Sequence, residues 1–369
     1  MGEIIKKALE LSINELITGV ICLSLNTMKY TQINTGILSF GMSGRVFHAP
    51  FIHTNPHFNL SAVVERSKKN AYQFYPGIIS YDTIADLLAD DTIELVIVNT
   101  PNYTHFQYAK EALEAGKHVL IEKPAVDDSA QFDALLAISK QQGKQLFFYQ
   151  NRRYDSHFLD LKKVIESGEL GKLIEVHFRF DRYKMELGQK YFKEDTQYIS
   201  NGITYDLGPH LLDQAISLFG KPIKFSKTTS INRPDSKVAD YFHYHLYYPA
   251  ELNVYLTGSL LVASPQPAFV LHGTKGSFVK NMTDVQEQQL LDGMLPDDPS
   301  YGLEPAGLEG KLVTIDAANQ KHESFVTPHK GDYNQLFEAI YESLRNHVNY
   351  PIQADQIKWQ IELLEAENT

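Results

Sequence analysis

The strongest constraint on the fold is the alternation of short apolar runs with helix-like segments between residues 35 and 151. The apolar runs that we predict as strands cover residues 35–40, 60–66, 78–81, 95–100, 118–123 and 145–151. In the segment 105–116, Phe106, Ala109 and Leu113 recur at helical spacing before Gly116. Strands that alternate with helices are expected to form a parallel sheet with helices on both faces. This half of the chain therefore predicts a doubly wound α/β domain.

The first predicted strand runs into a nucleotide-binding turn whose first glycine is a serine. Residues 39–44 read Ser-Phe-Gly-Met-Ser-Gly, where the dinucleotide fingerprint has glycine at the first, third and sixth places. Gly41 and Gly44 keep the places that approach the pyrophosphate and pack helix against strand. Because serine is small, we expect a slightly altered turn at Ser39. The predicted cofactor contacts here are Phe40, Gly41, Met42, Ser43, Gly44 and Arg45.

The end of the second predicted strand carries residues that point to two different cofactors. Glu65 lies where a carboxylate accepts hydrogen bonds from the adenosine ribose of NAD. Arg66 and Ser67 follow at once, and this pair suits the 2′-phosphate of NADP. A solvated charged turn without a ligand is the third alternative. We expect NAD(P)(H) and slightly favour NADP(H).

The fourth and fifth predicted strands end in polar residues at the edge where open α/β sheets bind ligands. The predicted cofactor contacts at these ends are Thr100, Pro101, Asn102, His105, Glu122 and Lys123. Lys123 is followed by Pro124 and would place a cation beside a nicotinamide or a substrate hydroxyl. A lysine at a strand end is usually a surface residue, so this signal needs a second element.

That second element is the segment 205–214, in which Asp206 and His210 are four residues apart across a predicted helix start. A histidine near its usual pKa can take a proton from a hydroxyl, and a neighbouring carboxylate can orient it. The alternatives are a helix cap with a core histidine, and a metal site of Asp206, His210 and Asp213. We predict no metal.

Beyond residue 151 the sequence becomes rich in strands. Residues 172–183 alternate, with Ile174, Val176, Phe178 and Phe180 on one face. We predict a large, open, mostly antiparallel sheet that packs on one face and is available to a partner on the other. The expected domains are an extension at 1–27, a Rossmann domain at 28–151, and a substrate and oligomerisation domain at 152–369. The partner predicted for the open sheet is a second copy, giving a dimer or tetramer.

Composition limits the partners and the compartment. The 369 residues are 43% hydrophobic, which is too much chain for one ordinary core. A formal net charge of −11 argues against nucleic acid or an anionic membrane as partner. The single cysteine, Cys22, allows no internal disulfide. The apolar run 16–25 is too short to span a bilayer and lacks a convincing cleavage site, so we expect a cytoplasmic protein.

Taken together, these segments resemble the Gfo/Idh/MocA family of NAD(P)-dependent oxidoreductases, within it the NADP-using scyllo-inositol 2-dehydrogenase group. The similarity runs from residue 35 to the C-terminus, and its carriers are the segments 39–51, 63–67, 99–124, 149–158 and 205–214. The resemblance implies a Rossmann domain, a second α/β domain, and substrate held between them. It also implies a catalytic trio of Lys123, Asp206 and His210. The sequence departs from the family pattern at Ser39 and at 200–201, where glycines are usual.

The expected reaction is reversible hydride transfer between nicotinamide and a carbinol carbon of a small polyol or sugar, inositol-like. His210 would take the hydroxyl proton, Asp206 would orient His210, and Lys123 would bind the reacting oxygen. The predicted substrate contacts are Arg153, Tyr154 and Tyr183. Two alternatives stay open: a dinucleotide-binding regulator without turnover, and a hydrolase or dehydratase that uses NAD transiently.

Overall fold

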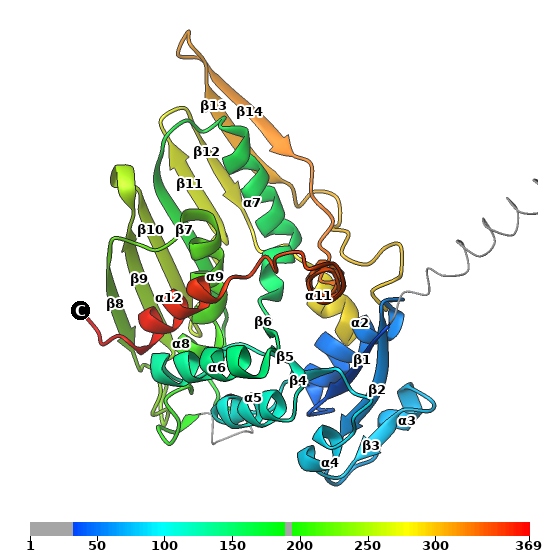
Figure 1. Ribbon diagram of the computed structural model, residues 1–369. Helices are drawn as coiled ribbons and strands as arrows, with labels where there is room; N and C mark the ends of the chain where they lie inside the picture. The colour runs from blue at the N-terminus through cyan, green and yellow to red at the C-terminus, as the bar shows by residue number, and fades with distance from the viewer. Residues whose placement is uncertain (1–31, 189–193) are drawn as a thin grey trace, which may run out of the picture.

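The computed structural model describes residues 32–188 and 194–369, which form two sheets with helices packed around them (Figure 1). The predicted extension at 1–27 and the first residues of the predicted Rossmann domain lie outside the described residues. The α/β prediction is confirmed: a parallel sheet comes first along the chain, and a mostly antiparallel sheet follows.

The first sheet is parallel throughout, in the order β3-β2-β1-β4-β5-β6. Its strands are β1 (Ile33–Ile37), β2 (Phe58–Val64), β3 (Ile79–Tyr81), β4 (Leu95–Val98), β5 (His118–Ile121) and β6 (Leu146–Phe148). Every residue of the central strand β4 is buried, because helices cover both faces of the sheet. Every strand except β3 ends before its predicted last residue, and β3 ends at residue 81 as predicted. The residues left over form the loops at the carboxyl edge, where a ligand of such a sheet binds.

The helices of this part connect its strands. They are η1 (Gly44–His48), α2 (Ala49–Thr54), α3 (Ala71–Phe74), α4 (Ile84–Leu88), η2 (Asn102–Thr104), α5 (His105–Glu114) and α6 (Ser129–Gln142). The bounds of α6 follow from its caps. The Asp128 side chain accepts a hydrogen bond from the Gln131 N–H, and Gly143 ends the helix with a φ of 62°.

The second sheet has the order β14-β13-β12-β11-β7-β10-β9-β8 and is antiparallel except where β7 and β10 run parallel. Its strands are β7 (Leu173–Asp181), β8 (Lys224–Ser230), β9 (Tyr241–Tyr247), β10 (Asn253–Ser259), β11 (Phe269–Gly273), β12 (Gly276–Lys280), β13 (Gly310–Ile315) and β14 (Lys321–Val326). The predicted alternation of β7 holds for Val176, Phe178 and Phe180, which are buried. Ile174 departs from this alternation: it is the second residue of β7 and its side chain is 46% exposed.

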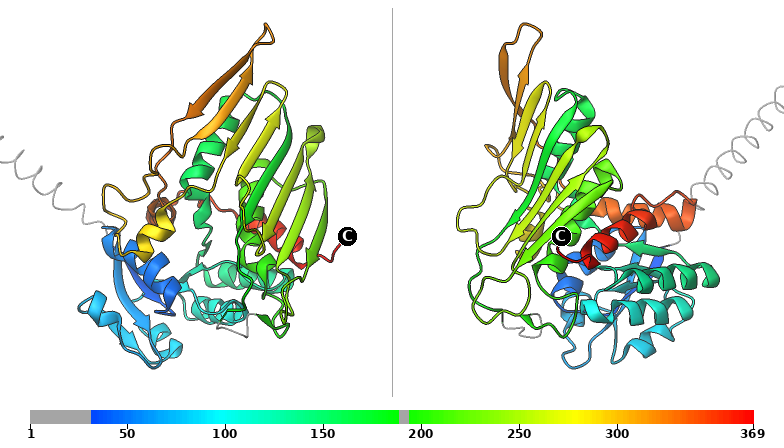
Figure 2. Two further views of the ribbon diagram at one scale, coloured as in Figure 1. Left: turned by 180° about the vertical axis from the view of Figure 1, so that it is seen from behind. Right: turned by 90° about the vertical axis from the view of Figure 1, so that its left-hand side faces the viewer.

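Helices cover one face of this sheet (Figure 2). The helices that follow β6 are η3 (Asn151–Tyr154), α7 (Ser156–Ser167), α8 (Ile203–Asp206), α9 (Gly208–Phe219), η5 (Pro249–Glu251), α10 (Gln286–Leu291), α11 (Asn334–Asn346) and α12 (Ala354–Glu365). The second hydrophobic core fills the space between the sheet and α7, α9 and the end of α12.

The opposite face of the second sheet carries a group of stacked rings. Tyr255 stacks on His177 and His245 with ring centroids 4.8 and 4.3 Å apart. His245 also lies 3.8 Å from the ring of Tyr247. Aromatic side chains are enriched at protein interfaces. The expected homo-oligomer through this face, a dimer or tetramer, stays a prediction.

The C-terminal helices join the two halves. Phe337 and Ile340 of α11 are buried in the first core, with the parallel sheet. Helix α12 contributes Ile357 to the first core and Leu363 to the second. The last segment of the chain therefore packs against both sheets.

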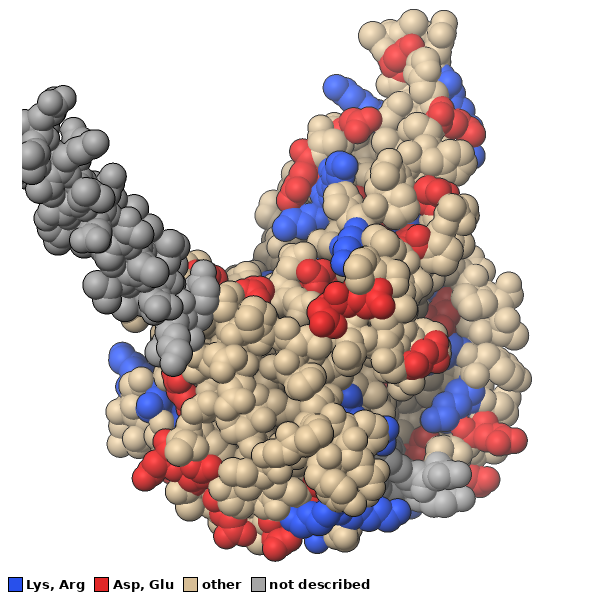
Figure 3. Space-filling model, turned by 90° about the vertical axis from the view of Figure 1, so that its right-hand side faces the viewer, with Lys and Arg blue, Asp and Glu red and all other residues tan. Residues whose placement is uncertain are grey.

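Acidic and basic side chains are interspersed on the face drawn in Figure 3. Within the described residues, the chain has no helix of the length and apolar character that a bilayer crossing needs. The expected absence of a nucleic-acid partner stays a prediction.

Candidate active site

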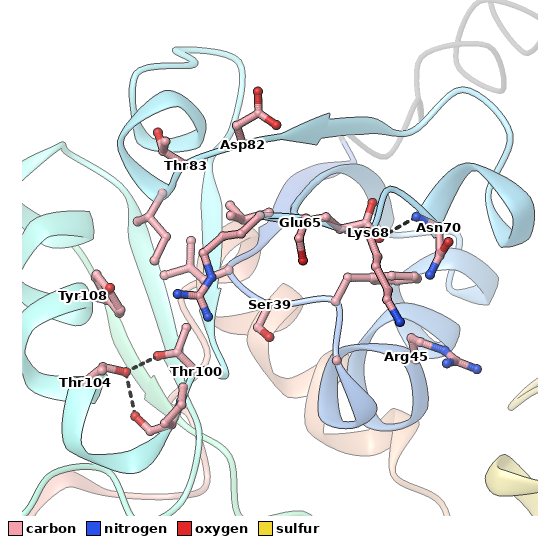
Figure 4. Close-up of a pocket in the computed structure, with 18 of the residues that line it drawn as sticks. Ser39, Arg45, Glu65, Lys68, Asn70, Asp82, Thr83, Thr100, Thr104 and Tyr108 are labelled. Carbon is pink, nitrogen blue, oxygen red and sulfur yellow. Dashed lines mark hydrogen bonds between the residues drawn. The ribbon is translucent and has the colours of Figure 1, made fainter.

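A groove of about 830 Å³ lies at the carboxyl ends of β1, β2 and β4 (Figure 4). The loops that follow these strands line it, with Ser39, Gly41, Arg45, Glu65, Arg66, Ser67, Lys68, Thr100, Pro101 and Tyr108 among the lining residues. The groove thus brings together segments that the sequence predicted separately as parts of one dinucleotide site.

The structure explains how serine replaces the first glycine of the turn. The φ angle of Ser39 is not positive, so its backbone conformation accepts a side chain. The Ser39 N–H donates to Asn99 Oδ1 at 2.9 Å, and Asn99 Nδ2 donates to the Ser39 carbonyl at 2.8 Å. A Cβ on Gly44 would lie 2.1 Å from that carbonyl oxygen, whereas a Cβ on Gly41 would meet nothing closer than 3.6 Å. Gly44 is thus required by packing, and Gly41 leaves room for a ligand.

The Glu65 carboxylate lines the groove and is held by hydrogen bonds from the segment that follows it, and its predicted contact with the ribose stays a prediction. Its carboxylate accepts hydrogen bonds from the Asn70 N–H at 2.8 Å and the Ser80 hydroxyl at 2.7 Å. The Ala71 N–H donates to the same carboxylate at 3.2 Å. Both carboxylate oxygens therefore hold the loop 66–71 against β3, because a buried carboxylate needs donors. The prediction missed this because the donors lie five or more residues farther along the chain.

Several cationic side chains line the groove. The Arg45 guanidinium lies 4.9 Å from the ring centroid of Phe74. Arg66, Ser67 and Lys68 are exposed and line the groove. Lys69 does not line the groove; its amine donates to the Ser80 carbonyl at 2.9 Å and lies 2.8 Å from the carboxylate of Asp82, which does line it. The groove therefore combines a glycine-rich turn with positive charge, which is the chemistry that phosphate groups require.

Some of the remaining predicted cofactor contacts line the groove, and others lie outside it. Phe40 lines the groove and is otherwise packed in the core, and Met42 is 61% exposed. Thr100 and Thr104 share a hydrogen bond at 2.6 Å on the groove wall. Asn102 Nδ2 donates to the Ser200 carbonyl at 3.4 Å and so reaches the second half of the chain.

His105 is buried, and its ring nitrogens lie within hydrogen-bond distance of backbone carbonyls. Nδ1 is 2.8 Å from the Pro124 oxygen and Nε2 is 2.9 Å from the Thr100 oxygen. Burial lowers the pKa of His105. Instead of reaching the groove as predicted, this side chain holds together the loops that follow β4 and β5.

Glu122 links the turn to the predicted catalytic lysine. Its carboxylate accepts a hydrogen bond from the Ser43 hydroxyl at 2.9 Å and lies 2.9 Å from His48 Nε2. Burial alone would raise the pKa of Glu122, but His48 and Lys123 lower it, and the net shift is downward. Ser43 and Glu122 were both predicted as cofactor contacts. Their hydrogen bond joins the turn before η1 to the end of β5.

Lys123 and Asp206 meet across the two halves of the chain. Lys123 Nζ donates to the Asp206 carbonyl at 2.7 Å and to its Oδ1 at 3.1 Å. Lys123 follows β5, and Asp206 is the last residue of α8. The sequence predicted both residues in one site, and the structure brings them together as an ion pair. Their predicted roles in catalysis stay predictions.

His210 lies on the next helix, α9, and is only 6% exposed. The helix is interrupted between Asp206 and Gly208, so the predicted four-residue spacing does not fall on one continuous helix. Nδ1 is buried and has no hydrogen-bond partner among the described residues. Burial, and then the charges of Lys123, Arg152 and Arg182, lower the pKa of His210 well below its usual value. His210 is therefore neutral near pH 7 and able to accept a proton.

Two arginines near His210 were missed by sequence reasoning. The guanidinium groups of Arg152 and Arg182 lie 5.0 and 4.9 Å from the ring centroid of Phe180. The Phe180 ring lies 6.5 Å from that of His210. The segment Asn-Arg-Arg at 151–153 signalled a functional arginine, but only the helical turn η3 decides which of the two faces the site.

Arg153 is the other arginine, and its predicted contact with substrate is replaced by an internal ion pair. Its Nε and Nη2 donate to the Asp213 carboxylate at 2.7 and 2.8 Å, and Nη2 also donates to Gln356 at 2.9 Å. Arg153 thereby clamps η3 to α9 and α12. The same bonds engage Asp213, which the alternative metal site would need. The described residues contain no cluster of histidine, cysteine and carboxylate groups that could hold a metal.

Tyr154 and Tyr183 differ in exposure. Tyr154 packs against the first core, and burial raises its pKa to about 12. Tyr183 is 62% exposed and pairs with Leu261 beside the end of β7. Tyr183 therefore stays a predicted substrate contact, whereas Tyr154 serves packing.

Comparison with known proteins agrees with this architecture. Residues 33–150 match the model of the oxidoreductase family with an NAD-binding Rossmann fold, and residues 158–279 match the GFO/IDH/MocA C-terminal domain. An uncharacterized oxidoreductase, C115.03, of Schizosaccharomyces pombe is 36% identical, covering 90% of this chain and 96% of the relative. The scyllo-inositol 2-dehydrogenase (NADP(+)) IolW of Bacillus subtilis is 31% identical over 92% and 93% of the two chains. An oxidoreductase structure from Bacteroides fragilis superposes with a TM-score of 0.82 at 39% identity, covering 90% and 96%.

Proposed function

Because this chain belongs to the Gfo/Idh/MocA family of oxidoreductases, we propose that it transfers hydride between NADP(H) and a carbinol carbon of a polyol or sugar. The observation that carries the proposal is the Lys123–Asp206 pair beside a buried, neutral His210. This cluster lies next to the strand ends that line the dinucleotide groove. A family relative with a similar sequence is named for the oxidation of scyllo-inositol.

The groove fits a dinucleotide. The turn at 39–44 would hold the pyrophosphate, because Gly41 leaves space above its Cα and Gly44 allows close packing. Thr100 and Pro101 would line the path toward the nicotinamide. When bound, the nicotinamide would supply the hydride acceptor or donor.

The preference for NADP(H) is supported by the assignment of Glu65. A free carboxylate at the ribose would repel a 2′-phosphate. In this structure the Glu65 carboxylate is buried and hydrogen-bonded by Asn70, Ala71 and Ser80. Arg66 and Ser67 remain as donors facing the groove, and a guanidinium binds a phosphate through two parallel hydrogen bonds.

His210, Lys123 and Asp206 have separate roles in the proposed reaction. His210 accepts the hydroxyl proton, which its neutral state permits. Lys123 stabilises the negative charge that develops on the reacting oxygen, as a preorganised cation does. Asp206 fixes the lysine amine through its carboxylate and its carbonyl. In this arrangement Asp206 positions Lys123, a change from the predicted pairing with His210.

The cofactor proposal is tested by titrating NADPH and NADH into the wild type and Arg66→Ala, with protein fluorescence as the readout. The wild type should bind NADPH more tightly. Arg66→Ala should weaken NADPH by about 1.5 to 3 kcal/mol, the value of a hydrogen bond to a charged group, and NADH by much less.

Lys69→Arg is the matched control, because Lys69 belongs to the same loop and the substitution keeps a cation beside Asp82, which lines the groove. It should not change the preference between the two cofactors. Tighter binding of NADH by the wild type, or equal losses of both cofactors in Arg66→Ala, would contradict the NADP(H) proposal.

A further inference from the structure

Arg182 lies directly after β7, next to the catalytic cluster, and carries an inference that rests on the proposed function. We infer that its guanidinium binds the oxygen on the carbon adjacent to the reacting carbinol. Arg182 would thereby select substrates with neighbouring hydroxyl groups. The preferred class is a vicinal polyol, such as a cyclitol or a sugar, over a simple alcohol.

The backbone of Arg182 is fixed on both sides. Its N–H donates to the Ser259 carbonyl at 2.9 Å, and its own carbonyl accepts from the Val262 N–H at 3.0 Å. Tyr183, the next residue, forms a bridge with Leu261. The side chain therefore projects from a rigid base, as a substrate contact requires.

The side chain lies between the solvent and the catalytic groups. Its guanidinium carbon is 4.9 Å from the ring centroid of Phe180, and the ring of His210 is 6.5 Å from that of Phe180. Nη1 is 3.9 Å from Asp206 Oδ2, which is too long for a hydrogen bond. The side chain is 42% exposed. Arg182 is thus close to the reacting groups and accessible to a ligand.

The other cations of the cluster already have partners. Lys123 donates to Asp206, and the Arg152 guanidinium lies 2.8 Å from the Glu287 carboxylate. Arg153 is bound to Asp213. Within the described part of the chain, the side chain of Arg182 makes no hydrogen bond in this structure, so its donors remain available beside His210.

The chemistry of a guanidinium defines the ligand. It offers several N–H donors in a planar fork and no acceptor. Two oxygens on neighbouring carbons match that fork. A substrate with a hydroxyl next to the reacting carbon can therefore satisfy both the fork and the proton-accepting His210, whereas a simple alcohol leaves the fork unused.

The test combines a change in the enzyme with a change in the substrate. We would measure kcat/KM for an inositol and for the matching deoxy-inositol that lacks the neighbouring hydroxyl, in the wild type and in Arg182→Gln. Each single change should lower kcat/KM by ~10-fold or more, and both together should lower it little further. Arg182→Lys should keep part of the rate, because the charge stays while the fork is lost.

Arg179→Gln is the matched control, since Arg179 pairs with Asp181 and lies on the face of β7 opposite the buried Phe180. It should leave the discrimination unchanged. If the two losses in Arg182→Gln are fully additive, Arg182 acts only through Asp206 and the inference is wrong. NADPH binding that persists without oxidation of any polyol by the wild type would overturn the proposed function and this inference together.

Discussion

The cofactor groove and the catalytic cluster are built in opposite ways. The groove is formed within the parallel domain, by loops that follow β1, β2 and β4, and its cations face open space. The catalytic cluster is assembled from both halves, because Lys123 follows β5 while Asp206 and His210 come from α8 and α9. Under the proposed function, cofactor binding therefore depends on local loops, whereas turnover also depends on how the two halves are held together.

The largest expected effect comes from the buried ion pair that joins η3 to α9. Arg153→Ala should leave the buried Asp213 carboxylate without its partner and lower the free energy of unfolding by about 3 to 5 kcal/mol. Denaturant unfolding monitored by circular dichroism measures this loss. Replacing both residues, as in Arg153→Met with Asp213→Leu, should recover most of it, because no unpaired charge remains.

Lys358→Ala is the control for this prediction, since its ion pair with Asp133 is exposed and crosses between helices α12 and α6. It should leave the unfolding curve unchanged. A single Arg153→Ala variant as stable as the wild type would show that this ion pair does not stabilise the fold.

The pH dependence of turnover reports on the buried His210 of the cluster, which the exposed groove does not contain. Because burial and neighbouring cations lower the pKa of His210, the imidazole stays neutral as the pH falls below the usual histidine range. The kcat for polyol oxidation should therefore show no acid limb near pH 6.5, the usual pKa of histidine, and should fall only at more acidic pH. A pH profile of kcat, measured with saturating cofactor, tests whether the pKa of His210 is lowered. Loss of activity with an apparent pKa at or above 6.5 would contradict the assignment of His210 as the base.

The smallest expected effect is at the first place of the turn. Ser39→Gly should change NADPH binding and stability by about 1 kcal/mol or less, because Ser39 does not need a glycine conformation. Gly44→Ala is the contrasting variant, since its Cβ would lie 2.1 Å from the Ser39 carbonyl oxygen. It should abolish NADPH binding, measured by the same fluorescence titration. Strong gain of affinity in Ser39→Gly would show that the serine distorts the turn.

The sequence predicted most of the parallel domain because its signals are local. The apolar runs, the helical spacing before Gly116 and the glycine-rich turn each act within a few residues. The groove residues Arg66, Ser67 and Thr100 follow from the rule that ligands bind at the carboxyl ends of parallel strands. The proposed preference for NADP(H) could not be argued in this way. It rests on Ser80, which lies on the neighbouring strand and donates a hydrogen bond to Glu65.

The structure brings Lys123 and Asp206 together as predicted, while the catalytic roles of Lys123, Asp206 and His210 stay predictions. Lys123, Asp206 and His210 were identified from strand ends, spacing and family resemblance, yet the pairing of Asp206 with Lys123 needed the two halves in place. The different contacts of Arg152 and Arg153 could not be predicted for the same reason, because they depend on residues far along the chain. Nothing local separates Arg152 from Arg153, and only the contacts with Phe180 and Asp213 distinguish them.

The most direct test of the account measures cofactor binding and hydride transfer in the same variants. Lys123→Ala and His210→Ala should bind NADPH with nearly the wild-type affinity, because neither residue belongs to the groove lining. Both should reduce the rate of NADP⁺ reduction by an inositol, followed by ultraviolet absorbance, by ~10² or more. Wild-type rates in both variants, or loss of NADPH binding together with turnover, would contradict the separation of a local cofactor groove from a catalytic cluster shared by the two halves.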